Sequence, residues 1–134
     1  MREIEFRGKD NSVVGIEQKW LFGMLGVDKH GRFNITYTEK HPLGCTPYLQ
    51  TKTVDPATVG QFTGLFDKDG NKIFEGDILS YDDKPYGQVV YLIGEFRVLK
   101  IKPKGYVSLA KYHNVCKIIG IIHDDPNLLE EVGK

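Results

Sequence analysis

Hydrophobic and polar residues alternate over short stretches of this chain. In residues 2–8, Ile4 and Phe6 share one parity and charged residues occupy the other, a pattern that predicts a half-buried first strand. Residues 19–38 contain two apolar stretches on either side of Asp28–Gly31. This arrangement predicts a hairpin with a four-residue turn.

The second half of the chain shows the same short periodicity. Apolar stretches are interrupted at Asp82–Pro85, at Gly94 and at Pro103–Gly105, and these breaks predict a meander of short strands. Residues 116–123 predict a buried closing strand. A short helix is expected after it, with Asp125 as N-cap and Pro126 at the first helical position.

Composition agrees with a β-rich fold and limits the classes of protein. The chain has 134 residues, with fifteen Gly, seven Tyr and seven Phe, which is typical of short strands and tight turns in one domain or two small subdomains. There is no run of about 18 apolar residues, so we expect no membrane span. The charged N-terminal segment is unlike a signal peptide.

Charge is unevenly distributed although the formal net charge is zero. Residues 54–95 contain eight acidic and three basic residues, whereas residues 96–123 contain six basic residues and no acidic one. These segments can pair within one chain or between subunits, or the basic segment can face a polyanion.

Residues 64–79, GLFDKDGNKIFEGDIL, resemble a calcium-binding loop at first sight. With Asp67 as the first position of an EF-hand loop, Asp69 and Asn71 fit positions 3 and 5. However, Lys72 replaces the glycine at position 6, and Ile78 replaces the bidentate glutamate at position 12. The stretch therefore predicts a hairpin turn centred on its D-G pair, with no calcium site.

No motif predicts catalysis or a cofactor. The chain has no G-x-S-x-G elbow, no Walker loop and no G-x-G-x-x-G sequence. His41, Cys45, His113 and Cys116, with His123 nearby, are the right residue types for zinc, but their spacing matches no common zinc motif. We therefore expect no metal, no cofactor, no catalytic residue and no enzyme activity, and two reduced structural cysteines; a Cys45–Cys116 disulfide is the alternative.

Two features are candidate binding surfaces. In RVLKIKPKGY (97–106), three lysines and a tyrosine share one parity, so a single strand would present a basic face of the kind that holds a phosphate backbone. With one further lysine, this candidate nucleic-acid site comprises Lys100, Lys102, Lys104, Tyr106 and Lys111. A solvated edge strand is the favoured interpretation.

The second candidate surface is aromatic. Tyr81, Tyr86 and Tyr91 flank the turn DDKPYG. They are compatible with an aromatic groove for a peptide, but ordinary half-buried strand aromatics are favoured.

The segment VGQFTGLFDKDGNKIFEGDIL (59–79) is similar to the signature of the YopX family of phage and prophage proteins. The closing segment IIGIIHDDPNLLEE (118–131) also resembles that family, whereas the N-terminal FRGKD matches it weakly. The matching positions are Gly60, Gln61, Phe62, Thr63, Gly64, Leu65, Asp67, Gly70, Ile73, Phe74, Gly76, Asp77 and Ile78. The resemblance implies a cytoplasmic protein of unknown biochemical role, with no catalytic residues to carry over.

The resemblance also implies opening strands like those of SH3-like barrels. We therefore expect a mainly β fold in one compact unit: an N-terminal β subdomain over 1–52, and a part over 53–134 with a small SH3-like barrel (about 58–123) and a short C-terminal helix. The expected function is that of a non-catalytic binding or interaction protein that self-associates and contacts phage or host proteins. A nucleic-acid-binding barrel is the alternative.

Overall fold

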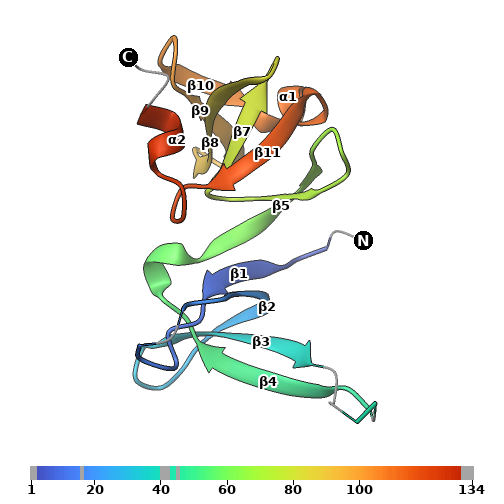
Figure 1. Cartoon of the computed structure of the whole chain (residues 1–134), viewed down its shortest axis with the longest axis vertical. Helices are drawn as coiled ribbons and strands as arrows, with labels where there is room; N and C mark the ends of the chain where they lie inside the picture. Colours follow the sequence, from blue (N-terminus) through green and yellow to red (C-terminus); the bar gives the residue numbers. More distant parts are fainter. Residues whose placement is uncertain (1–2, 16, 40–42, 45, 131–134) are drawn as a thin grey trace. The chain divides into compact units, whose positions relative to one another are not determined.

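The computed structural model describes residues 3–15, 17–39, 43–44 and 46–130. The chain divides into two compact units, residues 1–61 and 62–134, each built around antiparallel strands (Figure 1). The mainly β fold class is confirmed. The boundary expected at 52/53 stays a prediction, since compactness does not show which segment folds by itself.

The first unit is an antiparallel sheet in the order β4-β3-β2-β1. The predicted hairpin at Asp28–Gly31 joins β2 to β3, and Gly31 takes the left-handed conformation that the turn needs (φ +78°). Asp55 accepts from the backbone N–H of Ala57 (3.1 Å) and caps the short η1. The elements are β1 (Phe6–Lys9), β2 (Trp20–Val27), β3 (Phe33–Glu39), β4 (Tyr48–Thr53) and η1 (Pro56–Thr58).

This sheet curls so that the ends of β1 and β4 meet. An isolated bridge pairs Asp10 with Val54, and the N–H of Asn11 donates to the carbonyl of Thr53 (3.1 Å). Val54 and Ile35 are almost completely buried inside the curl. The first unit therefore has a small apolar interior of its own.

The second unit contains a five-stranded sheet in the order β10-β9-β8-β7-β11. Four strands form the predicted meander, and β11 returns to pair with the first of them, β7. The elements of this unit are β6 (Lys72–Phe74), β7 (Asp77–Tyr81), β8 (Lys84–Leu92), β9 (Glu95–Lys100), β10 (Gly105–Ser108), α1 (Leu109–Tyr112), η2 (His113–Val115), β11 (Cys116–Ile121) and α2 (Asn127–Glu130). Strand β5 (Gly60–Phe66) joins the units: its first two residues pair with β1, and its later residues pair with β6.

The predicted C-terminal helix is present as α2, whereas α1 and η2 were not predicted. The prediction named a small SH3-like barrel. Among the described strands, β10 and β11 are the two edges of the five-stranded sheet, and no pairing closes it. Within the described ranges, no helix has the length and apolar composition needed to span a membrane.

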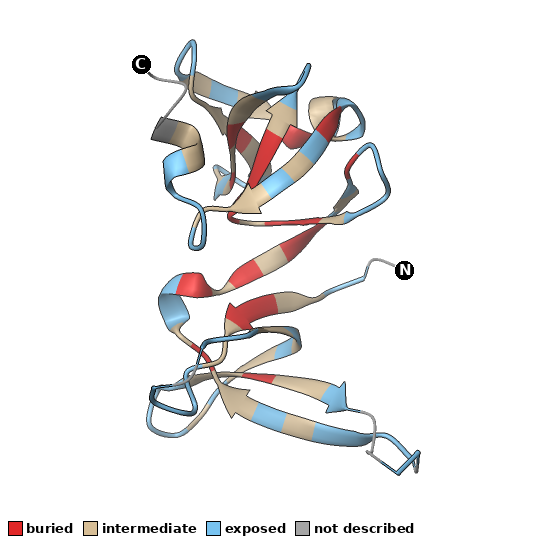
Figure 2. Ribbon diagram, viewed as in Figure 1, coloured by how far each residue is buried: buried red, intermediate tan, exposed pale blue. Residues whose placement is uncertain are grey.

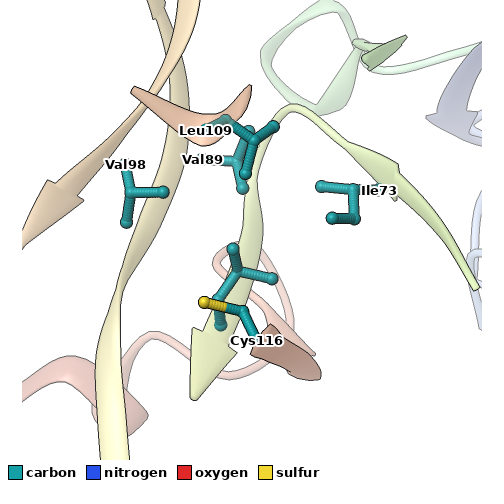
Figure 3. Close-up of a cluster of buried hydrophobic side chains, with 6 residues drawn as sticks. Ile73, Val89, Val98, Leu109 and Cys116 are labelled. Atoms are coloured by element: carbon teal, nitrogen blue, oxygen red, sulfur yellow. The ribbon is translucent and has the colours of Figure 1, made fainter. Parts of the chain in front are cut away.

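One face of this sheet carries the core of the second unit. Val89 on β8 lies opposite Val98 on β9, and both are buried because alternate residues of a strand point to the same side. Buried positions recur along the strands while the turns at the sheet ends are exposed (Figure 2). The core cluster consists of Ile73, Leu79, Val89, Val98, Leu109 and Cys116, of which five are labelled in Figure 3.

Cys116 is free and fully buried in this cluster, so the reduced, structural interpretation is confirmed for it and the disulfide alternative is wrong. Burial raises the pKa of the thiol to about 11, although nearby Lys68 lowers it slightly. Cys45 lies outside the described residues.

We expect Cys116 to react with thiol reagents at pH 8 roughly 100-fold more slowly in the folded than in the unfolded chain, because only the thiolate is nucleophilic. The measurement is the rate of alkylation of a Cys45→Ser variant, followed by mass with and without denaturant. Equal rates in the two states would contradict the burial of Cys116.

Candidate functional site

The hairpin turn in the family-like segment is held by the side chain of Asp67. One carboxylate oxygen accepts from the backbone N–H groups of Asp69 (3.0 Å) and Asn71 (2.8 Å), and the other accepts from the N–H of Ile118 on β11 (3.1 Å). Gly70 has the left-handed φ of +84° that the turn requires. The hairpin interpretation is therefore confirmed, and Asp67 acts as a structural anchor.

The G-D pair after β6 is a second structural turn. Gly76 has a φ of +91°; its N–H donates to the carbonyl of Val89 (2.9 Å), and its carbonyl accepts from the N–H of Ile122 (2.8 Å). The buried Asp77 carboxylate accepts from the N–H of Phe74 (2.8 Å). The family-like residues thus build turns and core, and this explains their pattern without any ligand.

Of the residues considered for zinc, the structure describes only His113, Cys116 and His123. Among the residues that the structure describes, no group of three or more His, Cys, Asp or Glu side chains is arranged to hold a metal ion. His113 is hydrogen-bonded through Nδ1 to the carbonyl of Phe66 (2.7 Å), and Cys116 lies in the core. His41 and Cys45 lie outside the described residues.

The prediction that residues 97–106 form a single strand with a basic face is wrong. Strand β9 ends at Lys100, residues 101–104 form a turn with a cis Lys102–Pro103 bond, and β10 begins at Gly105. Lys100 therefore shares the parity of the core residue Val98, whereas Tyr106 pairs with Leu99 on the other face of the sheet.

The five candidate residues are thus distributed over several elements. Lys102 and Lys104 are exposed on the turn, Lys100 is half-buried at the end of β9, and Tyr106 is half exposed on β10. Lys111 is exposed on α1. The structure brings Lys100, Lys102 and Lys104 together in one turn but does not extend them into a stripe with Tyr106 and Lys111. Their binding to nucleic acid stays a prediction.

Tyrosines gather next to the turn between β7 and β8. The ring centroids of Tyr81 and Tyr86 are 5.3 Å apart, and Tyr112 of α1 lies 6.3 Å from the first and 6.1 Å from the second. Tyr91 is not part of this cluster, because its ring contacts Phe96 (5.0 Å). The sequence pattern identified two of the three members. It missed Tyr112 because the four-residue helix that carries it is too short to show periodicity.

Burial, with smaller contributions from Tyr112, Cys116 and Tyr81, raises the pKa of Tyr86. The Tyr86 phenol is therefore uncharged at neutral pH. The cluster consequently offers aromatic surface and hydroxyl groups rather than a phenolate.

An acidic turn borders the tyrosine cluster. We call Asp82 and Asp83 the acidic turn; both have left-handed φ values, +53° and +63°, as in a tight type I′ hairpin. A shallow depression beside them is lined by Lys68, Tyr81, Asp82, Asp83 and Val115. This end of the second unit therefore combines exposed charge with aromatic surface, and aromatic residues are enriched at protein interfaces.

The fold and this turn-building segment define a mainly β protein built from antiparallel strands. The model of the family described as YopX protein matches residues 5–130, nearly the whole chain, so the chain belongs to the YopX family. The crystal structure of protein EF1440 from Enterococcus faecalis is similar in fold, with 22% identity over 96% of this chain and 99% of that chain and a TM-score of 0.56. No curated protein matches the chain.

Proposed function

We propose that this YopX family member is a non-catalytic interaction protein, encoded by a phage or prophage, that acts in the host cytoplasm and associates with copies of itself. The observation that carries the proposal is the tyrosine cluster and the exposed acidic turn beside it. Tyrosine is enriched at protein–protein interfaces because it offers a large apolar area and a hydrogen-bonding hydroxyl.

The family-like residues support this assignment indirectly. They are used in turns and in the core, through Asp67, Gly76 and Asp77. The exposed tyrosine and acidic side chains of the second unit are therefore more suitable as an interaction surface than the signature itself.

Molar mass by light scattering tests this proposal, at about 50 and about 500 mM salt, with and without a short DNA oligonucleotide. We expect a mass above that of one chain at the lower salt, and no change when DNA is added. A mass of one chain at both salt concentrations would contradict self-association.

Nucleic-acid binding remains the second candidate function, because Lys100, Lys102 and Lys104 share one turn. A complex with DNA that forms only at low salt and is lost on Lys→Glu substitution in this turn would support it. Binding that survives these substitutions would leave the turn without a role in nucleic-acid recognition.

A further inference from the structure

Two oppositely charged turns project from the same end of the five-stranded sheet in the second unit (Figure 1). One is the acidic turn. The other, which we call the lysine turn, comprises residues 100–104 and carries Lys100, Lys102 and Lys104. Strand register places both at this end, because Gly87 of β8 pairs with Lys100 and the N–H of Ile101 donates to the carbonyl of Tyr86 (3.1 Å).

Both turns present their charges to solvent. Asp82, Asp83, Lys102 and Lys104 are exposed. Within the described part of the chain, neither of these aspartates forms an ion pair with a lysine of the neighbouring turn. The two turns therefore keep their charge available for another molecule.

The location of both turns at one end of the sheet determines which symmetry a contact would have. If two copies meet end to end about a two-fold axis between the turns, the acidic turn of each copy faces the lysine turn of the other. One such contact closes a dimer and satisfies both pairs of turns at once. A head-to-tail contact between an acidic and a basic segment would instead leave one turn of each kind open at the ends.

We propose that this end of the sheet is a reciprocal dimer contact, in which the acidic turn of each copy receives the lysine turn of its partner. The inference rests on the proposed self-association and specifies its surface. Tyr81, whose side chain is 42% exposed beside the acidic turn, supplies apolar area to a contact whose exposed ion pairs are individually weak.

The direction in which salt changes the dimer affinity distinguishes pairing of opposite turns from repulsion between like-charged ends. Lys68 and Lys84 border the acidic turn, so this end of the sheet has a positive net charge. Repulsion between two such ends would make association stronger at high salt, whereas pairing of the opposite turns makes it weaker. We expect the dimer to weaken as salt is added.

Charge reversal tests the reciprocal pairing. The Lys102→Glu/Lys104→Glu variant has two acidic turns, and the Asp82→Lys/Asp83→Lys variant has two basic turns. We expect each alone to dimerise at least about tenfold more weakly than the unchanged chain. Mixed in equal amounts they should form a heterodimer, which light scattering at about 50 mM salt detects.

Two further variants keep the test decisive. Lysine is strained at a left-handed position, so Asp82→Asn/Asp83→Asn removes the same charges with a residue that tolerates this conformation. It should also weaken the dimer. Lys29→Glu is the matched control, because Lys29 is an exposed lysine in the turn between β2 and β3, outside both turns of this contact, and it should leave the dimer unchanged.

The failures of the two proposals are distinguishable. An unchanged chain that is monomeric overturns both self-association and this contact. A dimer that persists in the charge-reversed variants, or charge-reversed variants that do not pair when mixed, overturns the contact alone. A molar mass that keeps growing with protein concentration overturns the closed dimer. If the Lys102→Glu/Lys104→Glu variant loses DNA binding but still self-associates, the dimer contact is overturned and the lysine turn is assigned to nucleic acid.

Discussion

Replacement of Gly87 by alanine is expected to destabilise the chain by about 3 kcal/mol. Gly87 is buried in β8, and a Cβ atom there would lie 2.3 Å from the carbonyl oxygen of Leu99 and 2.7 Å from Cγ1 of Val98. Because the first of these atoms belongs to the backbone, it cannot move away without separating β8 from β9. Urea-induced unfolding measures the loss.

Gly26→Ala is the matched control for this prediction. Gly26 is also a strand glycine, but its added Cβ would meet Oδ1 of Asn34 at 2.8 Å, at the end of a side chain that can rotate away. We expect a change in the free energy of unfolding below about 1 kcal/mol. Equal losses in the two variants would show that the close approach of β8 to β9 is not the cause.

The turns were the part of the fold that local sequence predicted best. Gly31 and Gly70 each stand where a left-handed residue closes a hairpin, and few other residues adopt that conformation without cost. The D-G pair consequently identified the hairpin turn of the family-like segment. The mainly β class followed from the same short periodicity.

The candidate basic face failed because two sequence signals conflicted. Lysine parity over 97–106 favoured one strand, whereas Pro103 and Gly105 favoured a turn. The turn prevailed, and antiparallel pairing then placed Lys100 and Tyr106 on opposite faces. Parity predicts a common face only within one uninterrupted strand.

The surface proposed for self-association is formed by residues that are far apart in the sequence. Tyr112 joins Tyr81 and Tyr86 only because α1 returns the chain from β10 toward β7. The location of the acidic and lysine turns at one end of the sheet likewise follows from the pairing of β8 with β9. Composition alone showed an acidic and a basic segment, without their common location.

Asp67→Ala is expected to destabilise the chain by about 2–3 kcal/mol at pH 7. The substitution leaves the backbone N–H groups of Asp69, Asn71 and Ile118 without their charged acceptor, and hydrogen bonds to charged groups are stronger than neutral ones. It also removes the side-chain link between the β5–β6 hairpin and β11, while the backbone bond from the N–H of Lys68 to the carbonyl of Cys116 remains. The measurement is the free energy of unfolding in urea, and Asp69→Ala is the control because it removes an exposed carboxylate while keeping the backbone donor.

The same carboxylate should make stability depend on pH. Burial opposes the charge of Asp67, but the backbone N–H donors of Asn71, Ile118 and Asp69 outweigh it and hold its pKa below the ordinary value. A pKa lower in the folded than in the unfolded chain contributes stability that is complete above the unfolded value of about 4. That contribution is lost as the pH falls through the folded value.

Asp67→Asn separates this contribution from the other acidic residues, because the amide cannot titrate. We expect the difference in unfolding free energy between the unchanged chain and the variant to be constant from about pH 7 to pH 5 and to shrink below about pH 4. A difference that stays constant down to pH 2 would show that Asp67 is not held ionised by the turn. In that case the hydrogen bonds to Asp69, Asn71 and Ile118 would stabilise the protonated form equally well, and anchoring by charge would be the wrong explanation of this family-like position.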